Sequence, residues 1–183
     1  MKKQDVIKLT STSRIARFES REHYERYKKL LPSIFMGVAD PRSIGCEYDE
    51  SHGNLALTAG LDVLCLLLIG NVNCQPYGAT SRILVGDGTT PAAQEQTALQ
   101  GENQAAAVMT PGYPMVDQPR AVLFQASFSE DEANFAWEEW GIDNGVDAEI
   151  GSGFGEKLLN RKVEYRGTKN GGVWVIQTRV QLG

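Results

Sequence analysis

An alternation of apolar and polar residues marks the second half of the chain. In GGVWVIQTRVQL, residues 171–182, the side chains suited to a buried sheet face recur at every second position. In AVLFQASFS, residues 121–129, apolar side chains alternate with Gln125 and two serines, so we expect one face of this strand to meet water. SRILVGD, residues 81–87, predicts a further strand.

The segment NFAWEEWGI, residues 134–142, changes phase along its length. Its two tryptophans fall on opposite faces of a regular strand. A bulge near Glu138 and Glu139 would bring both indole rings to one side. We therefore expect Trp137 and Trp140 in the core, together with Trp174.

A turn signal lies between the last two strand-like segments, KLLNRKVEYRGTK and GGVWVIQTRVQL. Asn170-Gly171 is a pair that readily takes the positive φ angles of a tight turn. The sequence predicts that these two strands form a hairpin.

Two segments show helical periodicity. SREHYERYKKLLP, residues 20–32, predicts a helix that Ser20 caps and Pro32 ends. After a short strand at 55–57, the segment 58–70, TAGLDVLCLLLIG, predicts a second helix that is capped by Thr58 and closed by a glycine. Because the second helix carries little polar surface, we expect it to be buried on most sides.

These elements predict a mainly β fold: an antiparallel β-sandwich or jelly roll with one or two short helices and an extended N-terminal arm. Residues 1–53 are interpreted as the arm, with its short helix, and residues 54–183 as the sandwich domain. The arm either packs on its own domain or reaches a neighbouring subunit.

Composition narrows the function classes. The chain has 183 residues, which suits one domain, and a net charge of −5, which argues against a general nucleic-acid binder. The most apolar run, residues 61–70, is about half the length that spans a bilayer. Because no leader segment is evident either, we expect a soluble protein without a membrane partner.

Three cysteines, Cys46, Cys65 and Cys74, are too few for a disulfide framework, and Cys65 is expected in the core.

The stretch VGDGTTPAA, residues 85–93, raises one candidate chemistry. A phosphate-binding loop needs backbone N–H groups that converge on an anion, and Gly86 to Thr90 with Asp87 as a metal ligand meets part of that need. Nothing else for ATP hydrolysis is visible. A strand that turns into a short helix from Pro91 to Leu99 is therefore the favoured interpretation.

Other candidate sites lack a partner at a useful spacing. His23 and His52 lie in separate segments, so neither predicts a metal site. Five carboxylates gather in SEDEANFAWEE and fit a solvated turn better than a calcium loop; they are Glu130, Asp131, Glu132, Glu138 and Glu139. The sequence therefore predicts no catalytic residue, no cofactor and no metal.

Three blocks follow one another along the chain: NLALTAGLDVLCLLLIGN, RILVGDGTTPAAQEQTALQGE, and ANFAWEEWGIDNG with the final KLLNRKVEYRGTKNGGVWVIQTRVQL. In this order they resemble a group of small tailed-bacteriophage virion proteins. The resemblance covers about residues 54–182. Residues 1–50 match nothing in it, and residues 145–155 form a longer, more Gly-rich insert than the usual loop.

The resemblance implies a non-enzymatic structural protein of a phage particle. We expect a capsid decoration or cement protein on the outside of the head, with the major capsid protein and copies of itself as partners. The alternative is a tail or fibre component that contacts the host receptor or glycans, for which exposed aromatic side chains at Tyr77, Tyr113 and Phe154 would be suited.

Overall fold

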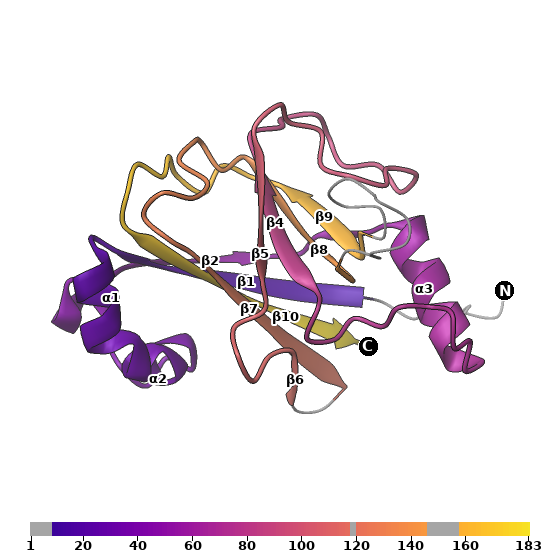
Figure 1. Ribbon diagram of the computed structural model, residues 1–183, viewed down its shortest axis with the longest axis horizontal. Coiled ribbons are helices and arrows are strands. Elements are labelled where there is room, and N and C mark those ends of the chain that lie inside the picture. Colours follow the sequence, from indigo (N-terminus) through magenta and orange to yellow (C-terminus); the bar gives the residue numbers. More distant parts are fainter. Residues whose placement is uncertain (1–8, 118–119, 146–157) are drawn as a thin grey trace, which may run out of the picture.

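The computed structural model describes residues 9–117, 120–145 and 158–183, and it consists mainly of two antiparallel sheets of five strands each (Figure 1). In the first sheet the order is β2 (Glu47–His52), β1 (Leu9–Phe18), β10 (Val173–Leu182), β7 (Ala121–Phe128) and β6 (Met115–Asp117). In the second sheet the order is β3 (Leu55–Ala56), β9 (Asn160–Val163), β8 (Glu139–Asp143), β4 (Arg82–Gly86) and β5 (Gln104–Val108). The β-sandwich expected from the alternating pattern is confirmed.

The main core lies between the two sheets. Ile15 and Ile176 contribute to it from the first sheet, and Ile83 and Ile142 from the second. All three tryptophans join this cluster, as expected from their spacing. The N–H of Glu138 donates to the carbonyl of Gly86, although Glu139 is the residue opposite Gly86 in the strand register. Two successive residues thus face one, which is the predicted bulge.

Short helices pack on one end of the outer face of the first sheet. These are α1 (Arg21–Tyr27), the 3-10 turns η1 (Lys28–Leu30) and η2 (Pro41–Ile44), and α2 (Leu31–Phe35). Ser20 caps α1 as predicted, with its hydroxyl accepting from the N–H of His23 at 3.1 Å. Pro32 does not end the helix but lies in the first turn of α2, where its missing N–H costs nothing. Leu31 and Phe35 pack against Val175 of β10 in a second small core.

The N-terminal region is not a separate arm. The ten residues of β1 pair with β10 from Leu9 opposite Leu182 to Phe18 opposite Val173, and β2 pairs with the other edge of β1. Residues 9–52 therefore supply two strands of the first sheet. The polar side chains of LTSTSRIARF concealed this strand, because two of them, Ser11 and Ser13, are buried although they are polar.

Three local predictions are wrong. β9 and β10 do not form a hairpin, because β9 lies in the second sheet and β10 in the first, and Asn170-Gly171 belongs to the crossing between them. The segment from Pro91 to Leu99 is not helical. Gln125 does not face water but is buried, and its side-chain oxygen accepts from Nε2 of Gln177 at 3.1 Å.

Helix α3 (Thr58–Leu68) is also less buried than expected. Its N-cap is Leu57 rather than Thr58, whereas Gly70 takes the predicted left-handed conformation beyond its end. Gly60 and Val63 are the buried residues of this helix. Cys65 is exposed, and beyond it Leu68, Ile69 and Val72 are 86%, 78% and 92% exposed. The apolar pattern of this segment therefore leaves a hydrophobic surface next to the sandwich.

Candidate functional site

The loop of residues 87–103, which joins β4 to β5, contains the glycine-rich motif singled out in the sequence. Asp87 and Asn103 close its base: the N–H of Asp87 donates to the carbonyl of Asn103 at 3.1 Å. The Asp87 carboxylate in turn accepts from Nδ2 and the N–H of Asn103, at 2.6 and 3.1 Å. The hydrogen bond from the Asn103 side chain lowers the pKa of Asp87. The hydrogen bonds of Asp87 with Asn103 thus join the two ends of the loop.

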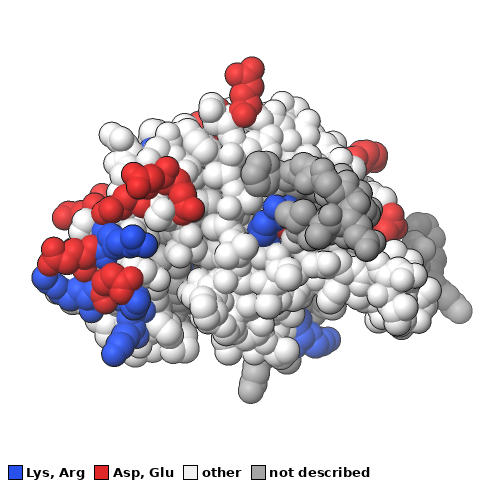
Figure 2. Space-filling view, viewed as in Figure 1, with Lys and Arg blue, Asp and Glu red and all other residues white. Residues whose placement is uncertain are grey.

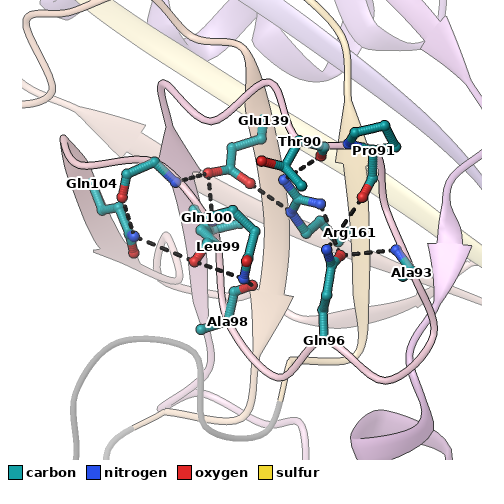
Figure 3. Close-up of polar contacts among 11 residues, drawn as sticks. Thr90, Pro91, Ala93, Gln96, Ala98, Leu99, Gln100, Gln104, Glu139 and Arg161 are labelled. Carbon is teal, nitrogen blue, oxygen red and sulfur yellow. Dashed lines mark hydrogen bonds and ion pairs between the residues drawn. The ribbon is translucent and has the colours of Figure 1, made fainter.

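Glu139 of β8 extends beneath this loop as a buried carboxylate (Figure 3). Its Oε1 accepts hydrogen bonds from the backbone N–H groups of Gln100 and Gly101, at 2.8 and 2.7 Å. Its Oε2 accepts from Nε of Arg161 at 2.5 Å. Both side chains of this ion pair are fully buried. Each charge is therefore compensated in a region that excludes water.

Arg161 of β9 holds the far side of the loop by hydrogen bonds. Its Nη1 donates to Oε1 of Gln96 at 2.8 Å, and its Nη2 donates to the carbonyl of Thr90 at 2.9 Å (Figure 3). The Gln96 side chain then accepts from the N–H of Ala93 and donates to the carbonyl of Pro91. The loop lacks regular secondary structure between its ends, and side chains of the sandwich replace the backbone ladder that would otherwise order it.

The glycines of the motif make room for Glu139. A Cβ atom at Gly88 would lie 2.3 Å from Oε1 of Glu139 and 2.5 Å from the backbone nitrogen of Gly101. A Cβ at Gly86 would lie 2.8 Å from the same carboxylate oxygen. Because no side chain fits at these distances, the Gly-Asp-Gly pattern is explained by close packing against a carboxylate.

This arrangement defines what the loop can do chemically. The N–H groups of Gln100 and Gly101 converge on an anion, but that anion is the protein's own Glu139. A phosphate at the same place would meet a fixed negative charge. The interpretation of the motif as a turn agrees with this geometry, although the turn leads into an ordered loop rather than a helix.

The remaining sequence candidates are dispersed. Nε2 of His23 lies 2.6 Å from the carbonyl of Ile44, and its ring packs edge-on against Phe18. His52 is on β2, where its ring contacts Thr12 and Glu50. Within residues 9–117, 120–145 and 158–183, no group of three or more His, Cys, Asp and Glu side chains is arranged to hold a metal ion.

The five acidic residues around 130–139 do not form one site. Glu130 accepts from the N–H of Arg21 at 2.7 Å, and Glu132 accepts from the N–H and hydroxyl of Ser129. Asp131 is exposed and Glu138 is half-buried, while Glu139 is the buried partner of the loop.

Two of the three aromatic residues named for glycan contact, Tyr77 and Tyr113, are partly buried. Tyr77 is partly buried and lines an apolar cavity of about 230 Å³ with residues such as Leu64 and Phe124. Tyr113 packs against the main core, and burial raises its pKa. Phe154 lies outside the described residues.

Sequence reasoning missed the buried charges. Arg161 gave no signal, because an arginine in a strand is most often exposed. A second cluster was missed in the same way: the Asp49 carboxylate accepts from both Arg17 and Arg166, and Arg166 Nη1 donates to Oγ of Ser13 at 3.2 Å. The Arg17 guanidinium also lies 4.6 Å from the ring centroid of Trp174. This cluster binds the crossing between the sheets to β1 and β2.

Among the described residues, no helix has both the length and the apolar character needed to cross a membrane. Comparison with protein-family models, with curated proteins and with solved structures finds no match for this chain.

Proposed function

We propose that this protein is a non-enzymatic structural component of a phage particle, and that it decorates the outside of the capsid, where it binds the major capsid protein and further copies of itself. The sequence resemblance across residues 54–182 motivates the proposal. The observation that carries it is the way the sandwich holds the loop 87–103 through the buried Glu139–Arg161 pair.

A preformed loop is suited to a permanent contact. Thr89, Pro91, Gln94, Glu95 and Thr97 are exposed on it. Because the backbone beneath them is fixed by buried hydrogen bonds, the loop loses little conformational entropy when a partner binds. Long loops without secondary structure are frequently sites of function in compact domains.

The exposed surface offers further contacts for an assembled protein. The apolar residues at the end of α3 lie at one end of the molecule, and the loop 87–103 lies along one side of the second sheet (Figure 1). The charged helix α1 and the uncharged α2 lie at the opposite end from α3, where acidic and basic side chains are interspersed (Figure 2). A cement protein needs several such surfaces, because it bridges neighbouring subunits.

Copy number and location test the proposal. Heads and tails of particles that contain this chain are separated, and the chain is quantified in each fraction by mass spectrometry. We expect hundreds of copies with the heads. A few copies confined to the tails would overturn the decoration role and favour the tail or fibre alternative.

A second experiment tests the loop itself. Purified protein is added to heads that lack it, and the bound amount is compared for wild type, Glu95→Lys on the loop, and Glu19→Lys, an identical charge change on an exposed residue near α1. We expect Glu95→Lys to weaken binding several-fold and Glu19→Lys to leave it unchanged. Equal binding by both variants would exclude this part of the loop from the contact.

A further inference from the structure

The apolar cavity of about 230 Å³ lies where α3 meets one end of the sandwich. Its walls come from the outer ends of β1 and β10, from the beginning of β7, and from Leu64 and Leu67 of α3. Phe124, Leu159 and Val180 form its buried inner wall and belong to the main core. Because the core holds this wall in place, the cavity has a defined shape without a ligand.

The lining of the cavity is apolar except at its mouth. Among the described residues that line it, Arg120 is the only charged one, and its side chain is exposed, as are those of Pro76 and Leu182. The N–H of Leu182 donates to the carbonyl of Arg120 at 3.0 Å and holds the arginine at the rim. Burial raises the pKa of Tyr77, so its hydroxyl stays neutral. The cavity thus combines apolar walls with one cation at the entrance.

The size of the cavity indicates the size of a ligand. An apolar cavity of about 150 Å³ in a protein core is large enough to bind benzene, a ring of six carbon atoms. The cavity beside α3 is about half as large again, so it fits an alkyl chain of about eight carbon atoms.

We propose that this cavity binds a medium-chain alkyl carboxylate, with the chain between α3 and the sheets and the carboxylate paired with Arg120 at the mouth. An alkyl chain has no polar group that the apolar walls would leave without a hydrogen bond. The carboxylate stays at the rim, where it keeps part of its hydration and accepts from a guanidinium that matches its planar shape. A sugar or another polar ligand would lose its hydration against these walls without replacement.

The charge of Arg120 is available for such a ligand. Its side chain makes no hydrogen bond or ion pair within residues 9–117, 120–145 and 158–183. Small-molecule sites are typically mostly apolar, with a few polar groups that fix the orientation of the ligand. The site goes beyond the proposed capsid role and is tested on the isolated protein, so the two proposals can fail separately.

The first experiment varies the length of the ligand. The ¹⁵N-labelled full-length protein is titrated with straight-chain carboxylates from butanoate to dodecanoate and followed by NMR. Each methylene that enters the cavity should tighten binding by up to about four-fold. The affinity should level off once the chain has about eight carbon atoms, because the cavity is then full. The amide signals of Leu64 and Val122 should be among those that shift.

Two results of this titration would overturn the proposal. The first is a wild-type protein that binds none of these carboxylates, as expected if another part of the chain or a second copy fills the cavity. The second is an affinity that rises evenly up to dodecanoate, which is typical of adsorption to an exposed apolar surface.

Adjacent leucines of α3 provide a matched pair of variants. Leu67 lines the cavity, whereas Leu68 is 86% exposed. Leu67→Trp places an indole ring in the cavity and should weaken octanoate binding at least ten-fold, while Leu68→Trp should bind as wild type. Leu67→Phe replaces Leu67→Trp if circular dichroism shows that the larger substitution unfolds the protein. Equal octanoate affinity of the folded Leu67 and Leu68 variants would overturn the cavity as the binding site.

A further comparison tests the carboxylate. Arg120→Gln should weaken octanoate binding several-fold and leave the binding of 1-octanol unchanged. Arg42→Gln makes the same charge change at a side chain that is 88% exposed on η2, and it should leave both ligands unaffected. Octanoate affinity that is unchanged in Arg120→Gln, or lowered equally in both variants, would overturn the pairing with Arg120.

Discussion

Oε2 of Glu139 accepts a 2.5 Å hydrogen bond from Nε of Arg161, and neither side chain is exposed to solvent. The same two residues hold the loop 87–103 from opposite sides, since Glu139 accepts from its backbone N–H groups and Arg161 donates to the carbonyl of Thr90. Stability and loop order are thus coupled through one ion pair.

Replacement of Arg161 by methionine tests this coupling. The variant leaves the Glu139 charge buried without its partner, so we expect the free energy of unfolding to fall by about 3–5 kcal/mol. Urea denaturation followed by tryptophan fluorescence measures the change. The double variant Glu139→Gln/Arg161→Met should lose less than the sum of the two single variants, because it leaves no unpaired charge.

The matched control is an exposed ion pair. Arg26 and Glu22 are 2.8 Å apart on α1, with side chains 61% and 83% exposed. Arg26→Met should therefore cost only about 0–1 kcal/mol. Equal losses for Arg161→Met and Arg26→Met would contradict the role of the buried pair.

Gly88→Ala tests the close packing of the glycine motif. The added methyl group meets both Glu139 and the backbone of Gly101, so we expect a loss of about 1–3 kcal/mol in thermal or urea unfolding. Gly78→Ala is the control, because a Cβ there has no neighbour within 4 Å and the φ angle is not positive. Equal stability of the Gly88→Ala and Gly78→Ala proteins would contradict the close packing of Gly88 against Glu139 and Gly101.

Trp140→Ala tests the bulge at Glu138 and Glu139, which turns the side chains of Trp137 and Trp140 towards the core. The side chain is 1% exposed, so its truncation should lower the free energy of unfolding by about 3–5 kcal/mol. Tyr165→Ala, at a side chain that is 59% exposed, should change it little. An unchanged melting temperature for Trp140→Ala would contradict the inward position of this ring.

Cys46 and Cys65 should differ in their reactivity. Burial raises the pKa of the Cys46 thiol from 9.0 to about 11, whereas Cys65 is exposed. At pH 8 the thiolate fraction of Cys46 is therefore about a hundredth of that of an ordinary thiol. Its alkylation should be slow and should accelerate as pH rises towards 11. Site-resolved mass spectrometry after brief iodoacetamide treatment measures this order, and faster labelling of Cys46 than of Cys65 would contradict it.

The sandwich could be predicted because its strands alternate in hydrophobicity. Trp174 and Ile176 follow the period of two and lie in the main core. The same reasoning failed for β1, because Ser11 and Ser13 occupy buried positions on a strand that lies between two others. A pattern of hydrophobic residues cannot reveal a strand whose buried side chains are polar.

The candidate site could be predicted only in part. The glycines of the motif indicate a tight backbone position, but the group that approaches them, Glu139, lies far away in the chain. Which sheet a strand joins is equally non-local: Asn170-Gly171 would suit a hairpin, yet the pairing of β10 with β1 and β7 places β10 in the other sheet. Both features depend on residues that lie far apart in the chain. At Asn170-Gly171 the long-range strand pairing overrides the local turn preference.

The pairing of β1 with β10 has a consequence for the order of folding. Leu9 lies opposite Leu182, so the middle of the first sheet needs segments from far apart in the chain. While the chain is synthesised, β1 emerges early and its main partner emerges late. The first sheet cannot close until β10 is made, and until then the apolar residues of β1 depend on other contacts or on chaperones.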